Sequence, residues 1–247
     1  MQNPRGRVVM LVASVVATLV TVGWAVHFAH VAATDDVRWA EYLEKDSFEG
    51  AGLIEDLTFF VLIPGILAAA FALVKWRKRV KWTWLKVYLA LWILACVYFA
   101  GEEVSWGQWW FGWETPEIFE QINYQGETNI HNTTSWLNQK PRAAVETFIM
   151  VAGLLVPVGL LALRKKVGRV DERLWWILAP SMCWAAAAYF VVVRFASWVS
   201  VHPLWDKMDE SELRELTIAW FLTLYLMSYA IRLGFEKDPG KPEIQEA

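Results

Sequence analysis

Six long apolar stretches alternate with polar segments along the 247-residue chain. A helix needs about 20 apolar residues to cross the hydrocarbon core of a bilayer. The strict apolar–polar alternation of membrane barrels is absent, so each stretch is expected to be a helix that satisfies its own backbone groups. The pattern predicts an all-α integral membrane protein, a bundle of six transmembrane helices near 8–33, 53–74, 84–101, 143–163, 174–193 and 216–233.

The first apolar stretch also has features of a cleaved signal peptide. Arg5 and Arg7 precede it, and small residues lie near its end at Val31-Ala32-Ala33. Its apolar run of about 26 residues is longer than the 7–15 residues of a signal h-region. We therefore expect a retained span and one transmembrane domain over 1–235, followed by a flexible tail at 236–247.

Charged residues divide between the two sides of the predicted bundle. If the N-terminus lies inside, the inner segments hold 16 of the 23 Lys and Arg and only 6 of the 26 Asp and Glu. Basic residues in short loops favour the cytoplasmic side, so the sequence predicts both termini in the cytoplasm. The basic inner face is typical of contact with anionic lipid headgroups, and we expect membrane lipids and no nucleic acid as partners.

The segment between the third and fourth spans, at 102–141, is too long for a structureless connection. We expect it to fold into an outer cap. Thr115-Pro116-Glu117 is a typical helix start, with Thr at the N-cap and Pro at the first helical position. Ile118, Phe119 and Ile122 then form one apolar stripe. The cap is therefore predicted to contain a short amphipathic helix at the membrane interface.

Glu102 and Glu103 end the third span, where the helix dipole is unfavourable for carboxylates. A bound cation or a chemical role would explain this placement; so would a hydrogen-bonded glutamate that fixes the following loop. The run 123–132 of that loop, NYQGETNIHN, can donate, accept and titrate. It is either a buried polar network that holds the cap or the wall of a site. The predicted catalytic residues are Glu102, Glu103, Glu127 and His131, and the predicted substrate-binding residues are Trp106, Gln108, Asn129 and Arg194.

A possible divalent metal is suggested by the first span. His27 and His30 are three residues apart, so they are neighbours on one helical face. With Glu55 they could form a His/carboxylate site for zinc, manganese or iron. Glu55 has a simpler interpretation as an acidic residue at a helix N-terminus. Pro64-Gly65, farther along the second span, predicts a kink that opens space between helices.

The cap contains three short runs, EEVSWGQ at 102–108, ETP at 114–116 and GETNIHN at 126–132. Together they resemble a pattern of uncharacterised bacterial multi-spanning inner-membrane proteins. No established activity accompanies that pattern. The resemblance implies a bacterial cytoplasmic membrane location and no particular chemistry.

Known enzyme signatures are missing from the sequence. There is no His-Glu-x-x-His motif, no Gly-x-Ser-x-Gly nucleophile elbow and no Walker glycine pattern. Three functions remain open. The chain could be an enzyme acting on a lipid or lipid-linked substrate at the outer leaflet, an ion-coupled or proton-coupled transporter, or an accessory subunit that docks a periplasmic or membrane protein partner.

Overall fold

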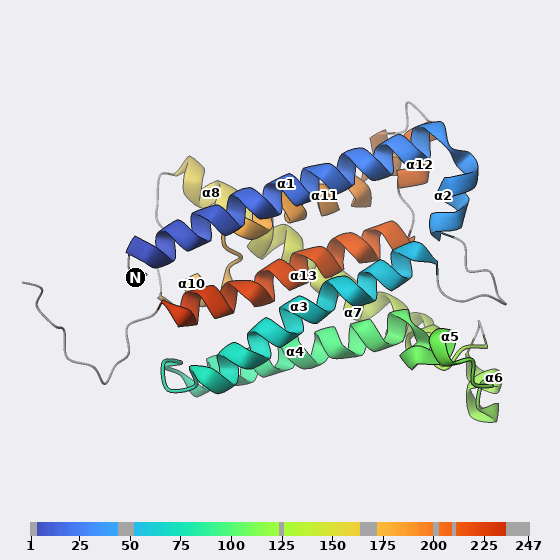
Figure 1. Cartoon of the computed structure of the whole chain (residues 1–247), viewed down its shortest axis with the longest axis horizontal. Helices are drawn as coiled ribbons and strands as arrows, with labels where there is room; N and C mark the ends of the chain where they lie inside the picture. The colour runs from blue at the N-terminus through green and yellow to red at the C-terminus, as the bar shows by residue number, and fades with distance from the viewer. Residues whose placement is uncertain are drawn as a thin grey trace, which may run out of the picture.

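The computed structural model describes residues 4–43, 52–123, 126–163, 172–199, 203–208 and 211–235, and every regular element in these ranges is helical (Figure 1). The elements in chain order are α1 (Pro4–Thr34), α2 (Asp36–Leu43), α3 (Leu53–Lys75), α4 (Thr83–Glu103), η1 (Ser105–Gly107), α5 (Gln108–Phe111), α6 (Glu117–Ile122), η2 (His131–Thr133), α7 (Ser135–Phe148), η3 (Ile149–Leu155), α8 (Val156–Ala162), α10 (Glu172–Ile177), η4 (Ser181–Cys183), α11 (Trp184–Arg194), η5 (Ala196–Val199), α12 (Pro203–Met208) and α13 (Ser211–Gly234).

Six helical segments are long and apolar enough to cross a membrane, which confirms the predicted fold class. They are Pro4–Thr34, Leu53–Lys75, Thr83–Glu103, Ser135–Ala162, Glu172–Arg194 and Ser211–Gly234. The largest difference from the predicted bounds is at the fourth span, which begins at Ser135 and not at 143. The Thr134 side chain accepts a hydrogen bond from the Leu137 backbone N–H, and this cap starts the helix inside the polar segment. The outer cap is correspondingly shorter than predicted.

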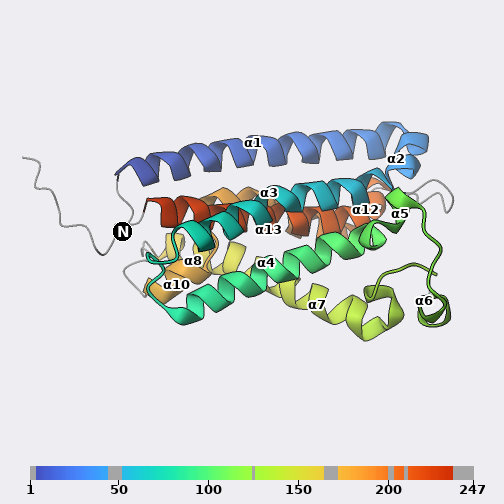
Figure 2. The ribbon, with the colours of Figure 1, turned by 60° about the horizontal axis from the view of Figure 1, so that its bottom comes forward.

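The last helix, α13, lies at the centre of the bundle (Figure 2). In its most apolar window 78% of the residues are buried, whereas the corresponding value for α1 is 11%. Helix α1 therefore packs along the outside of the bundle, while α13 is surrounded by α1, α3, α4 and α11. The apolar core follows α13 through residues such as Phe221, Tyr225 and Leu226.

The predicted opening at Pro64-Gly65 is not found. Helix α3 continues through both residues, from Leu53 to Lys75. A Cβ atom on Gly65 would lie 2.7 Å from the Cα of Thr223, so the missing side chain lets α3 approach α13 closely. The Thr223 hydroxyl donates to the Val61 carbonyl oxygen at 2.6 Å. The glycine closes the helix interface, and the expected space between helices does not form.

The fifth span is broken instead, at residues 178–180 between α10 and η4. The C-terminal carbonyl groups of α10 lack partners within that helix. Side chains of α13 bind them: Arg232 donates to the carbonyls of Trp175, Trp176 and Leu178 at 2.9–3.2 Å, and it is 2% exposed. The hydroxyls of Tyr225 and Tyr229 donate to the carbonyls of Ile177 and Trp176. We call Arg232, Tyr225, Tyr229 and these carbonyls the arginine–tyrosine cluster.

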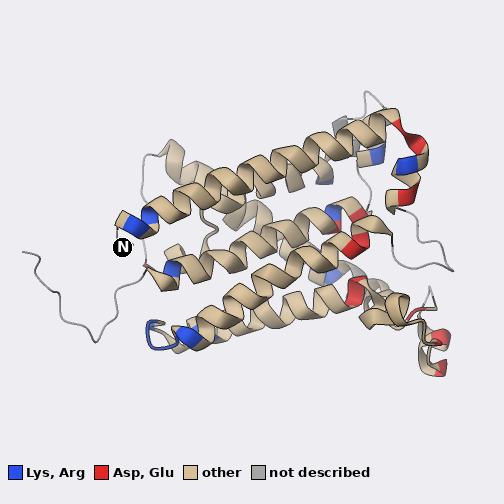
Figure 3. Ribbon diagram, viewed as in Figure 1, with Lys and Arg blue, Asp and Glu red and all other residues tan. Residues whose placement is uncertain are grey.

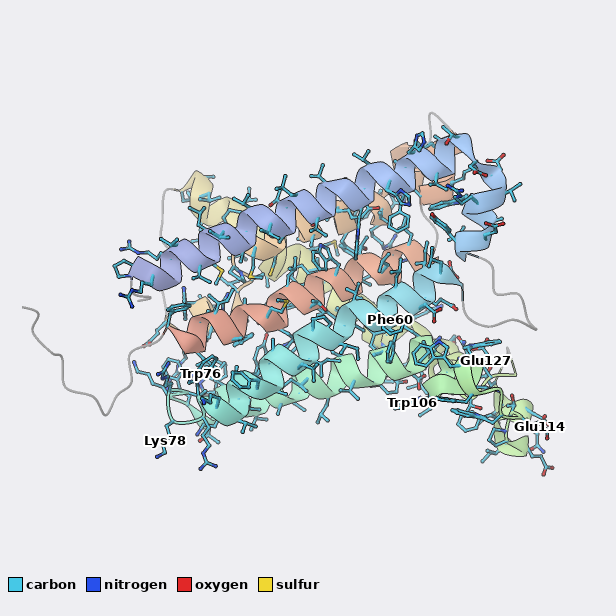
Figure 4. All side chains as sticks on the ribbon, viewed as in Figure 1. Phe60, Trp76, Lys78, Trp106, Glu114 and Glu127 are labelled. Atoms are coloured by element: carbon cyan, nitrogen blue, oxygen red, sulfur yellow. The ribbon has the colours of Figure 1, made fainter. Side chains whose placement is uncertain are left out.

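Charge separates along the length of the bundle (Figure 3). Lys and Arg gather where α1 begins and where α3 connects to α4, and we call this the basic end. Asp and Glu gather at α2, α6 and the C-terminus of α4, and we call this the acidic end. In Figure 4 the labelled residues Trp76 and Lys78 lie at the basic end, while Trp106, Glu114 and Glu127 lie at the acidic end. The predicted cap therefore belongs to the acidic end.

Candidate functional site

Helix α4 ends in an unusual turn. Ser105, Trp106 and Gly107 have φ values of 45°, 57° and 98°, so three consecutive residues lie in the left-handed region. Only Gly107 adopts this conformation without steric cost, and each of the other two costs about 1–3 kcal/mol. The turn ends α4 directly after Glu102 and Glu103. Surrounding hydrogen bonds must hold it in place, and Glu102 and Glu127 provide them.

Glu102 is the acceptor for four donors and is 3% exposed. The Trp106 indole N–H donates to Oε1 at 2.6 Å. The backbone N–H groups of Ile130 and His131 donate to Oε2 at 2.7 and 2.6 Å, and the Nδ1 atom of His131 lies 3.1 Å from the same oxygen. The charged acceptor therefore ties the strained turn to the loop 126–132 and also orients the imidazole ring of His131.

Glu127 occupies a second polar cluster beside the first. Its Oε2 atom accepts from the Ser105 hydroxyl at 2.9 Å and from the Asn129 amide at 2.6 Å. The Asn123 amide donates to the Asn129 backbone carbonyl at 2.8 Å and to its side-chain oxygen at 2.7 Å. All four side chains are buried. These residues form a buried network that holds the cap, which is one of the two interpretations left open by the sequence.

Gln108 fastens the first part of the loop 126–132. Its side-chain oxygen accepts from the Thr128 backbone N–H at 2.7 Å, and its amide donates to the Thr115 hydroxyl at 2.7 Å. That hydroxyl in turn donates to the Gly126 carbonyl at 2.6 Å. Helix α6 forms at Glu117–Ile122, as predicted, but its N-cap is Pro116 and not Thr115. Thr115 is unavailable for capping because it is used to fasten the loop.

Trp110 docks the cap onto the bundle. Its indole N–H donates to Asp56 at 3.0 Å, and its ring lies 4.7 Å from the Phe59 ring and 5.8 Å from the Phe60 ring. The start of α3 and the cap are therefore joined by one hydrogen bond and two aromatic contacts. This contact accounts for the acidic side chain of Asp56 in the first turn of α3.

A cavity of about 150 Å³ lies between α4, α7 and α13 at the acidic end. Its polar rim consists of Glu102, Glu103, His131, Arg142 and Glu215. Its walls are mainly apolar and include Trp92, Ala95, Phe99, Val145, Ile218 and Leu222. Ligand sites typically combine apolar walls with a few convergent polar groups, as here. This cavity is the candidate functional site.

The charged groups at the rim come from three helices. Arg142 of α7 donates to Glu215 of α13 at 2.6 Å and to the Ser211 hydroxyl at 2.9 Å. Glu103, at the end of α4, is 9% exposed and lines the same rim. Three carboxylates and one guanidinium line the cavity, which leaves the rim net negative when all are ionised and His131 is neutral. The rim can therefore accept hydrogen bonds from a polar headgroup and exchange protons with it.

The predicted site residues fall into two groups. Glu102, Glu103 and His131 meet at the cavity rim. Glu127, Asn129, Gln108 and Trp106 are engaged in the cap through the bonds described above. Arg194 belongs to neither group and does not line the cavity: its Nε atom is 3.3 Å from Glu146, which also has Arg214 at 3.6 Å. The structure thus brings three of the predicted residues together at one cavity, and the sequence could not separate cap residues from cavity residues.

The predicted metal ligands are not assembled into a site. His27 and His30 both have exposed side chains on α1, and the Nε2 atom of His27 lies 3.3 Å from the Tyr42 hydroxyl. Glu55 is buried at the start of α3. Within the described residues, no three His, Cys, Asp or Glu side chains are grouped so that they could hold a metal ion. The two histidines share a helical face that points away from the bundle core, and for this reason they do not meet Glu55 as predicted.

Two rim residues, Arg142 and Glu215, were not predicted from the sequence. One signal could have found Arg142: together with Arg194 and Arg214 it is a basic residue at the end of the bundle where basic residues are few. Glu215 carried no such signal, because an acidic residue in the first turns of a helix is ordinarily explained by the helix dipole. Their pairing depends on how α7 packs against α13.

The fold and the cavity define a class: a multi-pass, all-α membrane protein with an amphipathic cavity at one end. Comparison with known proteins adds no narrower identity, because no protein-family model, curated protein or solved structure matches this chain. Its function is therefore inferred from the chemistry of the site.

Proposed function

We propose that this chain is an enzyme that acts on a lipid or a lipid-linked substrate, with the acidic end on the outer face of a bacterial cytoplasmic membrane. The observation that carries the proposal is the Glu102–His131 pair at the rim of an apolar cavity. The orientation with both termini in the cytoplasm is supported by the gathering of Lys and Arg at the basic end.

The pair suits general base catalysis. A histidine that donates its Nδ1–H to a carboxylate keeps Nε2 free of a proton, so Nε2 can accept one from water or a substrate hydroxyl. Glu102 then acts as the positioning residue, and the two backbone N–H groups keep its carboxylate fixed. His131 is the group proposed to touch the substrate as base.

Glu103 and Arg142 complete the proposed chemistry. Glu103 lines the rim and would act as the acid or as a hydrogen-bond acceptor for the headgroup. Arg142 is held by Glu215 and would orient a polar or anionic part of the headgroup. The apolar walls below the rim match the hydrocarbon portion of an amphiphile.

Purified protein should convert a lipid species when it is incubated with a bacterial polar lipid extract and the products are followed by mass spectrometry. We expect His131→Gln and Glu103→Gln to lower the rate at least about a hundredfold, the usual contribution of a positioned acid or base. His27→Gln, an exposed histidine at the same end of the bundle, is the matched control and should retain the rate. If no lipid changes, or if both rim variants keep the wild-type rate, the proposal is wrong.

An accessory role is the second candidate, and the surface of the cap favours it. Phe111, Ile118 and Trp136 are 76%, 64% and 63% exposed, and the polar side chains of the cap bind mainly one another. Such a surface could lie in the headgroup region or dock a periplasmic or membrane protein partner. One partner that co-purifies in fixed stoichiometry with the wild type, and is lost from a Phe111→Ser and Ile118→Ser double variant, would favour this role.

A transporter role has less support. Transporter sites generally lie near the middle of the membrane at broken helices. The break in the fifth span already binds the side chains of Arg232, Tyr225 and Tyr229.

A further inference from the structure

The candidate cavity is elongated along the helices. On α4 it is lined from Trp92 to Glu103, with contributions at successive turns. The ten residue steps from Trp92 to Glu102 correspond to about 15 Å of helix. This length is half of the roughly 30 Å hydrocarbon core. In a bilayer whose hydrocarbon core begins at Glu102, the cavity would therefore extend to about the middle of the core.

Aromatic rings close the inner end of the cavity. The Trp92 ring lies 5.0 Å from the Phe148 ring and 5.9 Å from the Tyr225 ring, measured between centroids. The Tyr225 hydroxyl is engaged with the Ile177 carbonyl. Leu222 and Val145 line the cavity at this depth. Trp92 thus forms an apolar floor on a rigid base.

The side of the cavity opens toward the lipid. Ala95 of α4 and Pro141 of α7 both line the cavity, and both have exposed side chains. They lie on helices that would be surrounded by acyl chains in a membrane. A hydrocarbon chain could therefore enter between α4 and α7 without crossing the polar rim.

We propose that this cavity holds one hydrocarbon chain of a bilayer amphiphile, which enters sideways between α4 and α7, and that Trp92 limits the length of the chain. The inference rests on the proposed function, because it assigns the chain of the substrate whose headgroup meets Glu103 and His131. A single flexible chain fits the cavity because the lining residues follow successive turns of α4, whereas a compact ring would fill only part of that path.

Chain length should control affinity up to a limit. A chain that enters from the bilayer leaves hydrocarbon and not water, so each methylene group gains only dispersion contacts with the cavity wall. The dissociation constant, expressed as a mole fraction of the bilayer lipid, should fall with each added methylene until the chain reaches Trp92. Longer chains should bind with no higher affinity, because the Trp92 indole blocks the path.

The test uses the full chain in phosphatidylcholine nanodiscs, titrated with 1-monoacylglycerols of increasing chain length. Bound lipid is measured by native mass spectrometry. For the wild type we expect affinity to rise with chain length and then level off. Trp92→Ala should move this limit to longer chains, and Ala95→Trp, which narrows the path partway, should move it to shorter chains. Leu94→Ala, on the exposed face of α4, is the matched control and should leave the limit unchanged.

The two variants are expected to shift the chain-length limit in opposite directions. If Trp92→Ala does not fold, the shift to shorter chains in Ala95→Trp decides the test. Saturable binding whose chain-length limit is the same in the wild type and in the folded variants would overturn the inference. So would the failure of every monoacylglycerol to bind while lipid turnover continues. Loss of turnover in His131→Gln with an unchanged chain-length limit would support the proposed function independently, so the two proposals fail separately.

Discussion

Helix α13 carries a buried polar cluster toward each of its ends, and the two clusters differ in one respect. At the basic end, Arg232, Tyr225 and Tyr229 bind the carbonyl groups of α10 and are almost completely enclosed. At the acidic end, Glu215 pairs with Arg142 beside an open cavity. Both clusters place costly polar groups in a membrane helix. Buried polarity therefore does not by itself identify a site; space beside it for a ligand does.

The arginine–tyrosine cluster should give the largest effect on stability. Arg232→Ala removes the guanidinium that donates to three backbone carbonyls, and these carbonyls stay buried after that donor is lost. We expect a loss of about 3 kcal/mol or more in the free energy of unfolding. A thiol-reactive fluorophore can report thermal unfolding, because Cys96 and Cys183 are both buried in the folded protein.

The control is Lys81→Ala at the same end of the bundle. Lys81 pairs with Glu172 at 3.0 Å, but both side chains are more than half exposed. The expected change is at most about 1 kcal/mol. Equal stability of Arg232→Ala and Lys81→Ala would contradict the structural role assigned to the enclosed cluster.

Substitutions of the adjacent residues Glu102 and Glu103 should distinguish a residue that holds the cap from one that acts in lipid turnover. Glu102→Gln replaces the charged acceptor of four donors and should destabilise the cap by about 2–3 kcal/mol. Glu103→Gln keeps the shape of a rim residue and should cost less than about 1 kcal/mol while it lowers the rate of lipid turnover at least about a hundredfold. Limited proteolysis within 104–134 measures opening of the cap. Similar cleavage rates for the two variants would remove the distinction between cap and cavity residues.

The strained turn should give the smallest effect. Gly107 has a φ of 98°, and a Cβ atom there would lie 3.2 Å from the Phe111 ring. Gly107→Ala should therefore destabilise the cap by about 1–2 kcal/mol. Gly159→Ala on α8, where an added Cβ meets nothing within 4 Å, is the control and should be neutral or slightly stabilising. A more stable Gly107→Ala protein would show that the turn does not need the left-handed conformation.

Much of the fold could be predicted from the sequence because each spanning helix carries its own signal. An apolar run of sufficient length must be helical in lipid, whatever its neighbours are. The bounds were less predictable where polar residues continue a helix, as at Ser135–Arg142. The break in the fifth span was also missed, and the kink was expected at Pro64-Gly65. In both cases the outcome depends on α13, whose Thr223 packs on Gly65 and whose Arg232 stabilises the break.

The candidate site was predicted as a region and not as a set of residues. Local sequence marked Glu102, Glu103 and His131 because acids and imidazoles are costly beside a membrane span. It could not show that Glu127 and Asn129 bond to each other or that His27 and His30 face away from the core. The local sequence around Arg142 and Glu215 likewise did not show that they meet across two helices.

Taken alone, the sequence determined that six helices span a membrane and that acidic and basic residues occupy opposite ends, because hydrophobic length and loop charge are local properties. The tertiary structure decided which polar residues hold the cap and which face a cavity. That choice depends on contacts between helices distant in the sequence, since a side chain's role is fixed by whether neighbouring helices leave it a partner or an open space.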